Sequence, residues 1–142
     1  RDLHSFPTRR SSDLEPVPEV RSSILFPGML TGQAKWGALY GCETFVLPSH
    51  QENFGIAVVE AMACKKPVLI SNQINIWREI LTDGGGIVND DTLDGTIKLL
   101  NCWIHLAAEE KLTMEQNARK SFEKNFAIAP AADRFIEALK TA

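Results

Sequence analysis

A strand–helix–strand pattern at residues 44–71 limits the fold of this chain more than any other feature. "TFVLP" (44–48) and "PVLIS" (67–71) are short, continuous apolar runs, which is typical of strands that are covered on both faces. Between them, "FGIAVVEAMAC" (54–64) is predicted as a helix. Two buried strands joined by one helix form a right-handed crossover, so we expect the strands to be parallel.

The alternation continues along the chain. "NIWREILTD" (75–83) is predicted as a helix that ends at a run of glycines, and "GIVN" (86–89) as a short strand. Upstream, "SILF" (23–26) is predicted as a strand that a Pro-Gly turn follows. After residue 91 the pattern is helical throughout. The sequence therefore predicts an α/β fold: a Rossmann-like parallel sheet with flanking helices and a helical C-terminal tail.

Composition narrows the class of protein. The 142 residues are 44% hydrophobic, which suits one globular domain, and a net charge of −3 without a basic stripe argues against a nucleic-acid partner. No apolar run approaches the roughly 20 residues that span a bilayer, and no signal peptide opens the chain. Cys42, Cys64 and Cys102 lack metal-ligand spacing and are predicted to be small buried residues in a reducing compartment. We therefore expect a cytoplasmic protein.

The first fourteen residues, "RDLHSFPTRRSSDL", form a segment of a different kind. They show no hydrophobic period, and their basicity would suit a flexible arm. However, "HSFPTRRSSD" resembles the translation of a common short sequencing adapter. We therefore treat residues 1–14 as a non-native segment and take residues 15–142 as protein sequence, with the expectation that an upstream part of the protein has been lost.

The start of the helix at 54–64 is the candidate site. In open parallel sheets, ligands bind beyond the carboxyl ends of the strands, where helix N-termini offer unpaired N–H groups and a positive dipole end. Here strand 44–48 leads through "SHQENFG" directly into the helix. A phosphate placed there would meet the N–H groups of about Gly55, Ile56 and Ala57, and Gly55 would let the backbone come close.

Two glutamates flank this position. Glu52 lies in the loop before the helix, and Glu60 is about six residues into it, hence roughly 9 Å along the axis. A diphosphate at the helix start would have one acid on each side, one to hold a sugar and the other to accept hydrogen bonds from a ribose diol. The spacing alone is weak evidence, because Glu115 and Glu123 repeat it within a charged helix that is predicted to be solvated surface.

The residues around these two glutamates resemble those of a known family. "FVLPSHQENFGIAVVEAMACKKPVLIS", with "FPG" before it and "WREILTDGGGIVNDD" after it, resembles the C-terminal nucleotide-sugar-binding domain of GT-B glycosyltransferases of the family 4 group. That group is marked by a Glu-x7-Glu motif within "PSxxExFGxxxxEAMAxxxPV". The resemblance covers about residues 23–139. It implies that residues 15–142 are a partial C-terminal donor-binding domain, an incomplete C-terminal half of a GT-B fold.

The resemblance also implies an activity. A hexosyltransferase of this kind transfers a sugar, with retention of configuration, from a nucleoside-diphosphate sugar to a glycan or lipid-linked acceptor. Such transfers occur in exopolysaccharide and cell-envelope synthesis. The resemblance implies no metal or other cofactor. By the same resemblance Glu52 would be the catalytic residue that contacts the donor sugar, and Glu60 would bind the ribose hydroxyls. The remaining site residues would bind through backbone amides: those of Asn53, Phe54 and Gly55 the sugar hydroxyls, those of Ile56 and Ala57 the diphosphate.

Two parts of the family pattern are missing from the sequence. Members of the family also use a basic pair from earlier in the same domain to hold the diphosphate, and a whole N-terminal domain to present the acceptor. Lys65 and Lys66 cannot replace the pair, because they follow the far end of the helix. We therefore expect no measurable transferase activity from this chain alone. We also expect the missing N-terminal domain to be its partner, with peripheral association at the inner membrane face through that domain.

Other functions remain open at this stage. A sugar-nucleotide epimerase or a phosphorylase would also place phosphate at a helix end. A non-catalytic nucleotide-binding or regulatory α/β module is a further alternative, although the strands at 44–48 and 67–71 lack the Asp that a phospho-accepting regulator needs at a strand end. His50 is open between loop surface and a contact with the acceptor. Phe54 could place its side chain in the core while its amide serves the site.

Overall fold

The computed structural model describes residues 23–129, 132, 136–137 and 140. The chain divides into two units, Arg1–Gly32 and Gln33–Ala142. The segment 1–14 lies outside the described residues. In the first unit, Ser23–Thr31 form a turn and irregular backbone, so the predicted strand at 23–26 is wrong. The apolar run there stays exposed, with Leu25 87% accessible, and no strand in the described part of the chain pairs with it.

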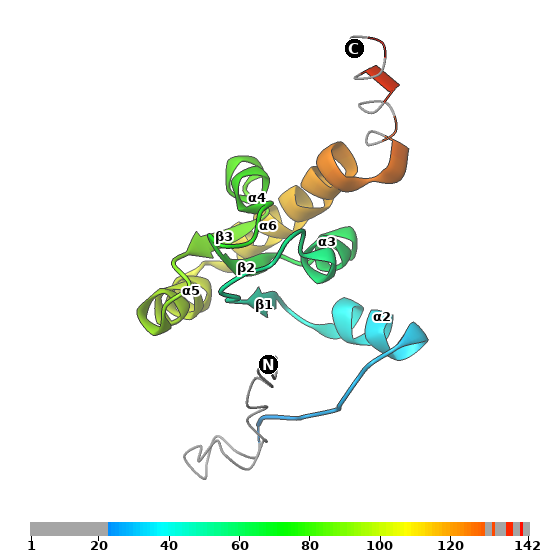
Figure 1. Cartoon of the computed structure of the whole chain (residues 1–142). Helices are drawn as coiled ribbons and strands as arrows, with labels where there is room; N and C mark the ends of the chain where they lie inside the picture. Colours follow the sequence, from blue (N-terminus) through cyan, green and yellow to red (C-terminus); the bar gives the residue numbers. More distant parts are fainter. Residues whose placement is uncertain (1–22, 130–131, 133–135, 138–139, 141–142) are drawn as a thin grey trace, which may run out of the picture. The chain divides into compact units, whose positions relative to one another are not determined.

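The second unit alternates strands and helices (Figure 1). In the part of this unit that the structure describes, the sheet has three strands in the order β1-β2-β3, and both neighbouring pairs are parallel. This confirms the predicted α/β fold class with its parallel sheet and flanking helices. The elements are α2 (Gly32–Gly41), β1 (Phe45–Leu47), α3 (Ile56–Ala63), β2 (Val68–Ser71), α4 (Trp77–Asp83), β3 (Gly86–Asn89), α5 (Leu93–His105), α6 (Ala108–Ser121) and the π-helix η2 (Phe122–Phe126).

The central strand β2 sets the register of the sheet. Phe45 of β1 lies opposite Val68, and Ser71 of β2 lies opposite Asn89 of β3. All four residues of β2 are buried, as its continuous apolar sequence predicts. Because the three strands run in one direction, their carboxyl ends meet at one edge of the sheet, and the loops that precede α3, α4 and α5 all leave from that edge.

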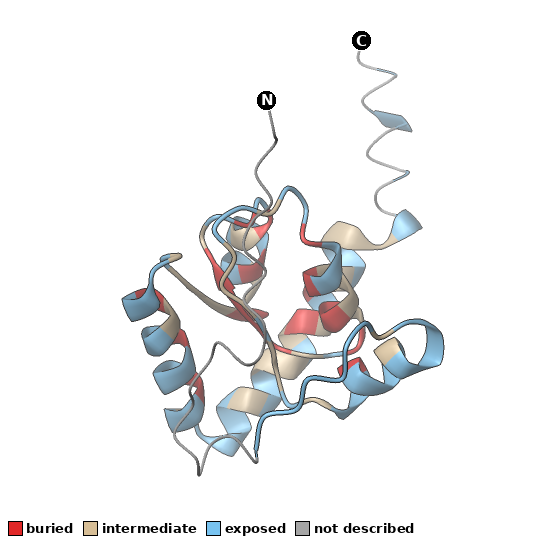
Figure 2. Ribbon diagram, turned by 60° about the horizontal axis from the view of Figure 1, so that its bottom comes forward, coloured by how far each residue is buried: buried red, intermediate tan, exposed pale blue. Residues whose placement is uncertain are grey.

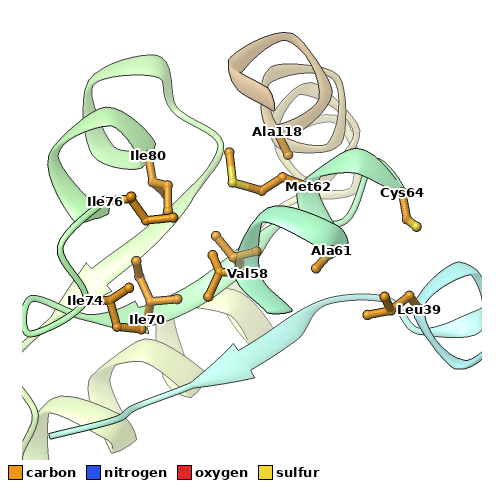
Figure 3. Packing of buried hydrophobic residues seen from close by; sticks show 11 residues of the cluster. Leu39, Val58, Ala61, Met62, Cys64, Ile70, Ile74, Ile76, Ile80 and Ala118 are labelled. Atoms are coloured by element: carbon orange, nitrogen blue, oxygen red, sulfur yellow. The ribbon is translucent and has the colours of Figure 1, made fainter. Parts of the chain in front are cut away.

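Alternation along β2 divides the core into two clusters. Val68 and Ile70 face a larger cluster that α3, α4 and α6 complete, whereas Leu69 faces a smaller one with α5. The red, buried positions in Figure 2 lie along the sheet and on the inward faces of the helices. Figure 3 shows the larger cluster, in which Met62 of α3 lies between Ala118 of α6 and Ile80 of α4.

Helix ends agree with the local sequence. α4 ends at Gly84, which adopts a left-handed conformation with φ of 69°, and Thr92 caps α5 by accepting a hydrogen bond from the N–H of Gly95 at 3.0 Å. The prediction that all three cysteines are buried holds for Cys64, but Cys42 is only partly buried and Cys102 is exposed. α5 turns Leu99 and Trp103 toward the sheet and leaves Cys102 exposed.

Candidate functional site

The N-terminus of α3 is open. Gly55 precedes the helix in a left-handed conformation, and no side chain caps the helix start. The N–H groups of Val58 and Val59 donate to the carbonyl of Gly55, at 2.9 and 3.1 Å. The N–H groups of Ile56 and Ala57 have no acceptor within the described part of the chain, and both residues are exposed. Two amide donors are thus available at the positive end of a helix dipole.

Gly55 is required at this position for two independent reasons. Its φ of 74° is a conformation that side chains with a Cβ rarely adopt. A Cβ would also lie 3.0 Å from Cγ2 of Ile74 and 3.4 Å from Cγ2 of Val58. The glycine therefore lets the chain turn sharply into α3 while it packs against the residues that follow β2.

The loop between β1 and α3 is joined to the segment after β2. The buried hydroxyl of Ser71 donates to the carbonyl of Ser49 and accepts from the N–H of Gln73. Further along, Glu52 and Ile74 form an isolated parallel bridge, in which the N–H of Asn75 donates to the carbonyl of Glu52 at 3.4 Å. These contacts fix the backbone that carries Glu52 relative to β2.

The two predicted acids have different surroundings. The side chain of Glu52 is half-buried and makes no hydrogen bond or ion pair with the residues that the structure describes. Glu60, on the second turn of α3, is paired with Lys35 of α2, whose Nζ lies 2.6 Å from Oε1 of Glu60. Lys35 could not be found from the sequence, because it precedes Glu60 by 25 residues and no motif includes it.

The aromatic residue of the loop lies at the surface rather than in the core. Phe54 is 49% exposed, and its ring meets that of Phe126 edge-on, with centroids 6.2 Å apart. The alternative in which its side chain lies in the core is therefore wrong, although its ring contacts Phe126, which packs against the larger core cluster. Asn53 beside it is exposed. The residues before α3 thus leave the helix start accessible.

The opposite end of α3 is held by a cation. Nη1 of Arg119, on α6, donates to the carbonyl of Ala63 at 2.5 Å, which satisfies a terminal carbonyl and complements the negative end of the dipole. The same side chain pairs with Glu123, so this glutamate is an ordinary partner on the surface of α6 and η2. Lys65 and Lys66 follow this end of α3 and not its N-terminus.

A polar network connects the loops at the carboxyl edge of the sheet. Nδ1 of His50 lies 3.0 Å from Oδ2 of Asp91, and the side-chain amide of Asn72 donates to Asp90 at 2.8 Å. His50 therefore has a partner that its sequence context did not reveal, while its side chain remains 84% exposed. Among the described residues there is no cluster of three or more side chains suited to a metal ion, and none of the helices there is long and apolar enough to cross a membrane.

Comparison with known proteins gives a consistent result. Residues 19–121 match the family described as Glycosyl transferases group 1. An uncharacterized glycosyltransferase of Methanocaldococcus jannaschii is 34% identical over 91 residues, which cover 60% of this chain and 24% of that protein. The O-antigen chain mannosyltransferase RfbU of Salmonella typhimurium is 48% identical over 46 residues, which cover 32% of this chain and 13% of that protein.

A solved structure shares the fold. Sucrose-phosphate synthase from Thermosynechococcus elongatus superimposes with a TM-score of 0.60 at 20% sequence identity, over 72% of this chain and 26% of that one. This match supports a GT-B type of architecture for the described sheet and helices. The chain spans 24% of the length of the Methanocaldococcus relative, so it corresponds to about a quarter of that protein.

Proposed function

The chain belongs to the group 1 glycosyl transferases, and we propose that it binds the nucleoside-diphosphate-sugar donor of a retaining sugar transfer. The observation that carries the proposal is the open start of α3, where the amides of Ile56 and Ala57 have no acceptor in the described part of the chain. A diphosphate is the ligand chemistry that suits such a position, because it can accept from adjacent N–H groups at the positive dipole end.

In this proposal each part of the donor has its own group on the protein. The amides of Ile56 and Ala57 hold the diphosphate, and those of Asn53, Phe54 and Gly55 bind hydroxyls of the donor sugar. Glu60 accepts hydrogen bonds from the ribose, and Glu52 contacts the sugar beside the reacting carbon. As the bond from that carbon to the diphosphate oxygen breaks, negative charge grows on the leaving diphosphate. The dipole of α3 and its two free amides stabilise that charge.

The half-buried side chain of Glu52 supports its assignment. It lies in a loop whose backbone is fixed against β2, and it has no protein partner among the described residues. A carboxylate held in this way can accept a hydrogen bond from a sugar hydroxyl without first leaving another partner. Retention at the reacting carbon is part of the proposal, and it is tested by the anomeric configuration of the product of an active transferase that contains this segment.

We further propose a glycan or lipid-linked acceptor of the cell-envelope type, presented by an N-terminal domain that associates peripherally with the inner membrane face. A relative named as an O-antigen chain mannosyltransferase supports a glycan acceptor. The family match supports a transferase over the epimerase, phosphorylase and regulatory alternatives.

Donor binding is tested by titrating the chain with UDP, GDP and ADP in a calorimeter. We expect one of the three to bind, and Glu60→Gln to weaken it by about 1 to 3 kcal/mol, roughly 5- to 150-fold, because a charged acceptor for the ribose is lost. Glu123→Gln is the matched control. Glu123 follows Glu115 by eight residues, as Glu60 follows Glu52, but it pairs with Arg119 at the surface. The control substitution should leave the affinity unchanged.

A second titration separates the role of Glu52 from that of Glu60. Glu52→Gln should leave the affinity for the nucleoside diphosphate unchanged and should remove the extra affinity that the sugar of the matching nucleotide sugar contributes. If none of the nucleotides binds, or if Glu123→Gln weakens binding as much as Glu60→Gln does, the proposed donor site is wrong.

A further inference from the structure

Lys35 is the nearest charged neighbour of a proposed donor-binding acid. Its Nζ lies 2.6 Å from Oε1 of Glu60 and 4.6 Å from the centre of the Trp36 ring. The side chains of Lys35 and Glu60 are 37% and 24% exposed, so the pair lies at the surface of the protein but is partly enclosed. This contact connects α2 with α3.

The geometry leaves half of the Glu60 carboxylate for a ligand. A carboxylate has two oxygens that can each accept hydrogen bonds. Lys35 contacts Oε1, and no residue in the described part of the chain makes a hydrogen bond or ion pair with Oε2. An unpaired glutamate at a helix surface would exchange among rotamers, whereas a glutamate held by one oxygen presents the other in a fixed direction. The Trp36 ring in turn restrains the ammonium group of Lys35.

An ordinary surface ion pair is the simpler explanation, and the two can be distinguished. An exposed ion pair contributes little to the free energy of folding. If the Lys35–Glu60 pair has no other role, replacing Lys35 should leave ligand recognition unchanged. The chain contains a matched pair elsewhere: Nζ of Lys111 lies 3.3 Å from Glu43 and 4.7 Å from the centre of the Trp103 ring. That lysine has the same kinds of contact but no connection to Glu60.

We propose that Lys35 is a positioning residue that holds the Glu60 carboxylate for recognition of the ribose, and that it thereby sets a preference for ribonucleoside over deoxyribonucleoside diphosphates. The inference rests on the proposed function, in which Glu60 accepts the ribose hydroxyls. A ligand that lacks one of these hydroxyls gains nothing from the oriented carboxylate, so Lys35 affects the ratio of the two affinities.

The test measures the affinities of UDP, GDP and ADP and of their 2′-deoxy forms by calorimetry, and uses the nucleotide that binds. We expect the native chain to prefer the ribose form, and Lys35→Met to reduce the preference by about 5- to 10-fold, as expected for loss of a charge-assisted contact. Lys35→Arg should restore most of the preference. Lys35→Met should have no further effect in a chain that already carries Glu60→Gln, and Lys111→Met should have none.

Each other outcome has a definite meaning. If Lys35→Met keeps the preference while Glu60→Gln abolishes it, the inference is wrong and the proposed function stands. If Lys35→Met weakens the ribose and deoxyribose forms equally, Lys35 acts on the diphosphate and not through Glu60, which also overturns the inference. If Glu60→Gln keeps the preference, or if nothing binds, the proposed function fails together with the inference. Urea midpoints of all variants show whether each one is folded.

Discussion

Replacing Gly55 by alanine tests whether the turn into α3 depends on this glycine. Two costs follow from the structure. The left-handed conformation costs a residue with a Cβ about 1 to 2 kcal/mol. The new methyl group would lie 3.0 Å from Cγ2 of Ile74, closer than ordinary van der Waals contact, and overpacking of this kind costs about 1 to 3 kcal/mol. Gly55→Ala should therefore lower the free energy of unfolding by about 2 to 5 kcal/mol.

Two other glycines separate these costs. Gly84 also has a positive φ, of 69°, but the nearest atom to its Cβ is the movable side-chain amide of Asn117 at 3.1 Å, so Gly84→Ala should cost only the conformational part, about 1 to 2 kcal/mol. Gly37 lies inside α2 with open space around it, and Gly37→Ala should stabilise the chain by about 0.5 to 1 kcal/mol.

The assay is equilibrium unfolding in urea, followed by far-UV circular dichroism. With a slope of about 1 to 3 kcal/mol per molar urea, a loss of 3 kcal/mol moves the midpoint down by about 1 to 3 M. We expect Gly37→Ala to be the most stable, followed by the native chain, then Gly84→Ala and finally Gly55→Ala. If Gly55→Ala is as stable as Gly84→Ala, the contact with Ile74 does not carry the expected cost of about 1 to 3 kcal/mol. If it is as stable as the native chain, the account of the turn is wrong.

Three further predictions concern the surroundings of the site and use the same urea assay. Arg119→Ala should cost about 1 to 2 kcal/mol, because the bond to the last turn of α3 is lost, whereas Lys120→Ala on the exposed side of the same helix should change the stability by less than about 0.5 kcal/mol. Thr92→Ala should cost about 1 kcal/mol through the lost cap of α5, and an unchanged midpoint would contradict that cap. The hydrogen bond from Lys124 holds the pKa of Asp83 below its ordinary value. The contribution of this carboxylate to the free energy of unfolding is therefore complete above the ordinary aspartate pKa of about 3.9, and it is lost as the pH falls through the lower folded pKa. Because Asp83→Asn removes the charged acceptor of the hydrogen bonds from Lys124 and Asn125, it should cost about 1 to 3 kcal/mol at pH 7. The variant should be less sensitive to acid than the native chain, and an equal acid sensitivity would contradict this.

The sheet was the most predictable part of the fold. β2 and β3 lie where the apolar runs at 67–71 and 86–89 place them, because strands buried on both faces leave a continuous signal in the sequence. The run at 23–26 is also apolar but forms no strand. A strand depends on a partner, and the local sequence does not record whether a partner exists.

The position of the open helix start was predictable, but its exact boundary was not. The sequence predicted a helix over 54–64, whereas α3 begins at Ile56 after a left-handed Gly55, and no side chain caps it. The surroundings of the side chains were not predictable. The contact of Lys35 with Glu60, and that of His50 with Asp91, join residues far apart in the sequence, so they depend on how the helices and loops pack. The exposure of Phe54 likewise depends on Phe126, which follows it by more than 70 residues.

The buried hydroxyl of Ser71 connects the loop before α3 to the segment that follows β2. Through Ser49 on one side and Gln73 on the other, and through the bridge between Glu52 and Ile74, two neighbouring loops share one set of hydrogen bonds. They should therefore open together in amide exchange, and not one at a time. A ligand that binds there meets a backbone that is already ordered, so little of its binding free energy is lost in freezing the loop.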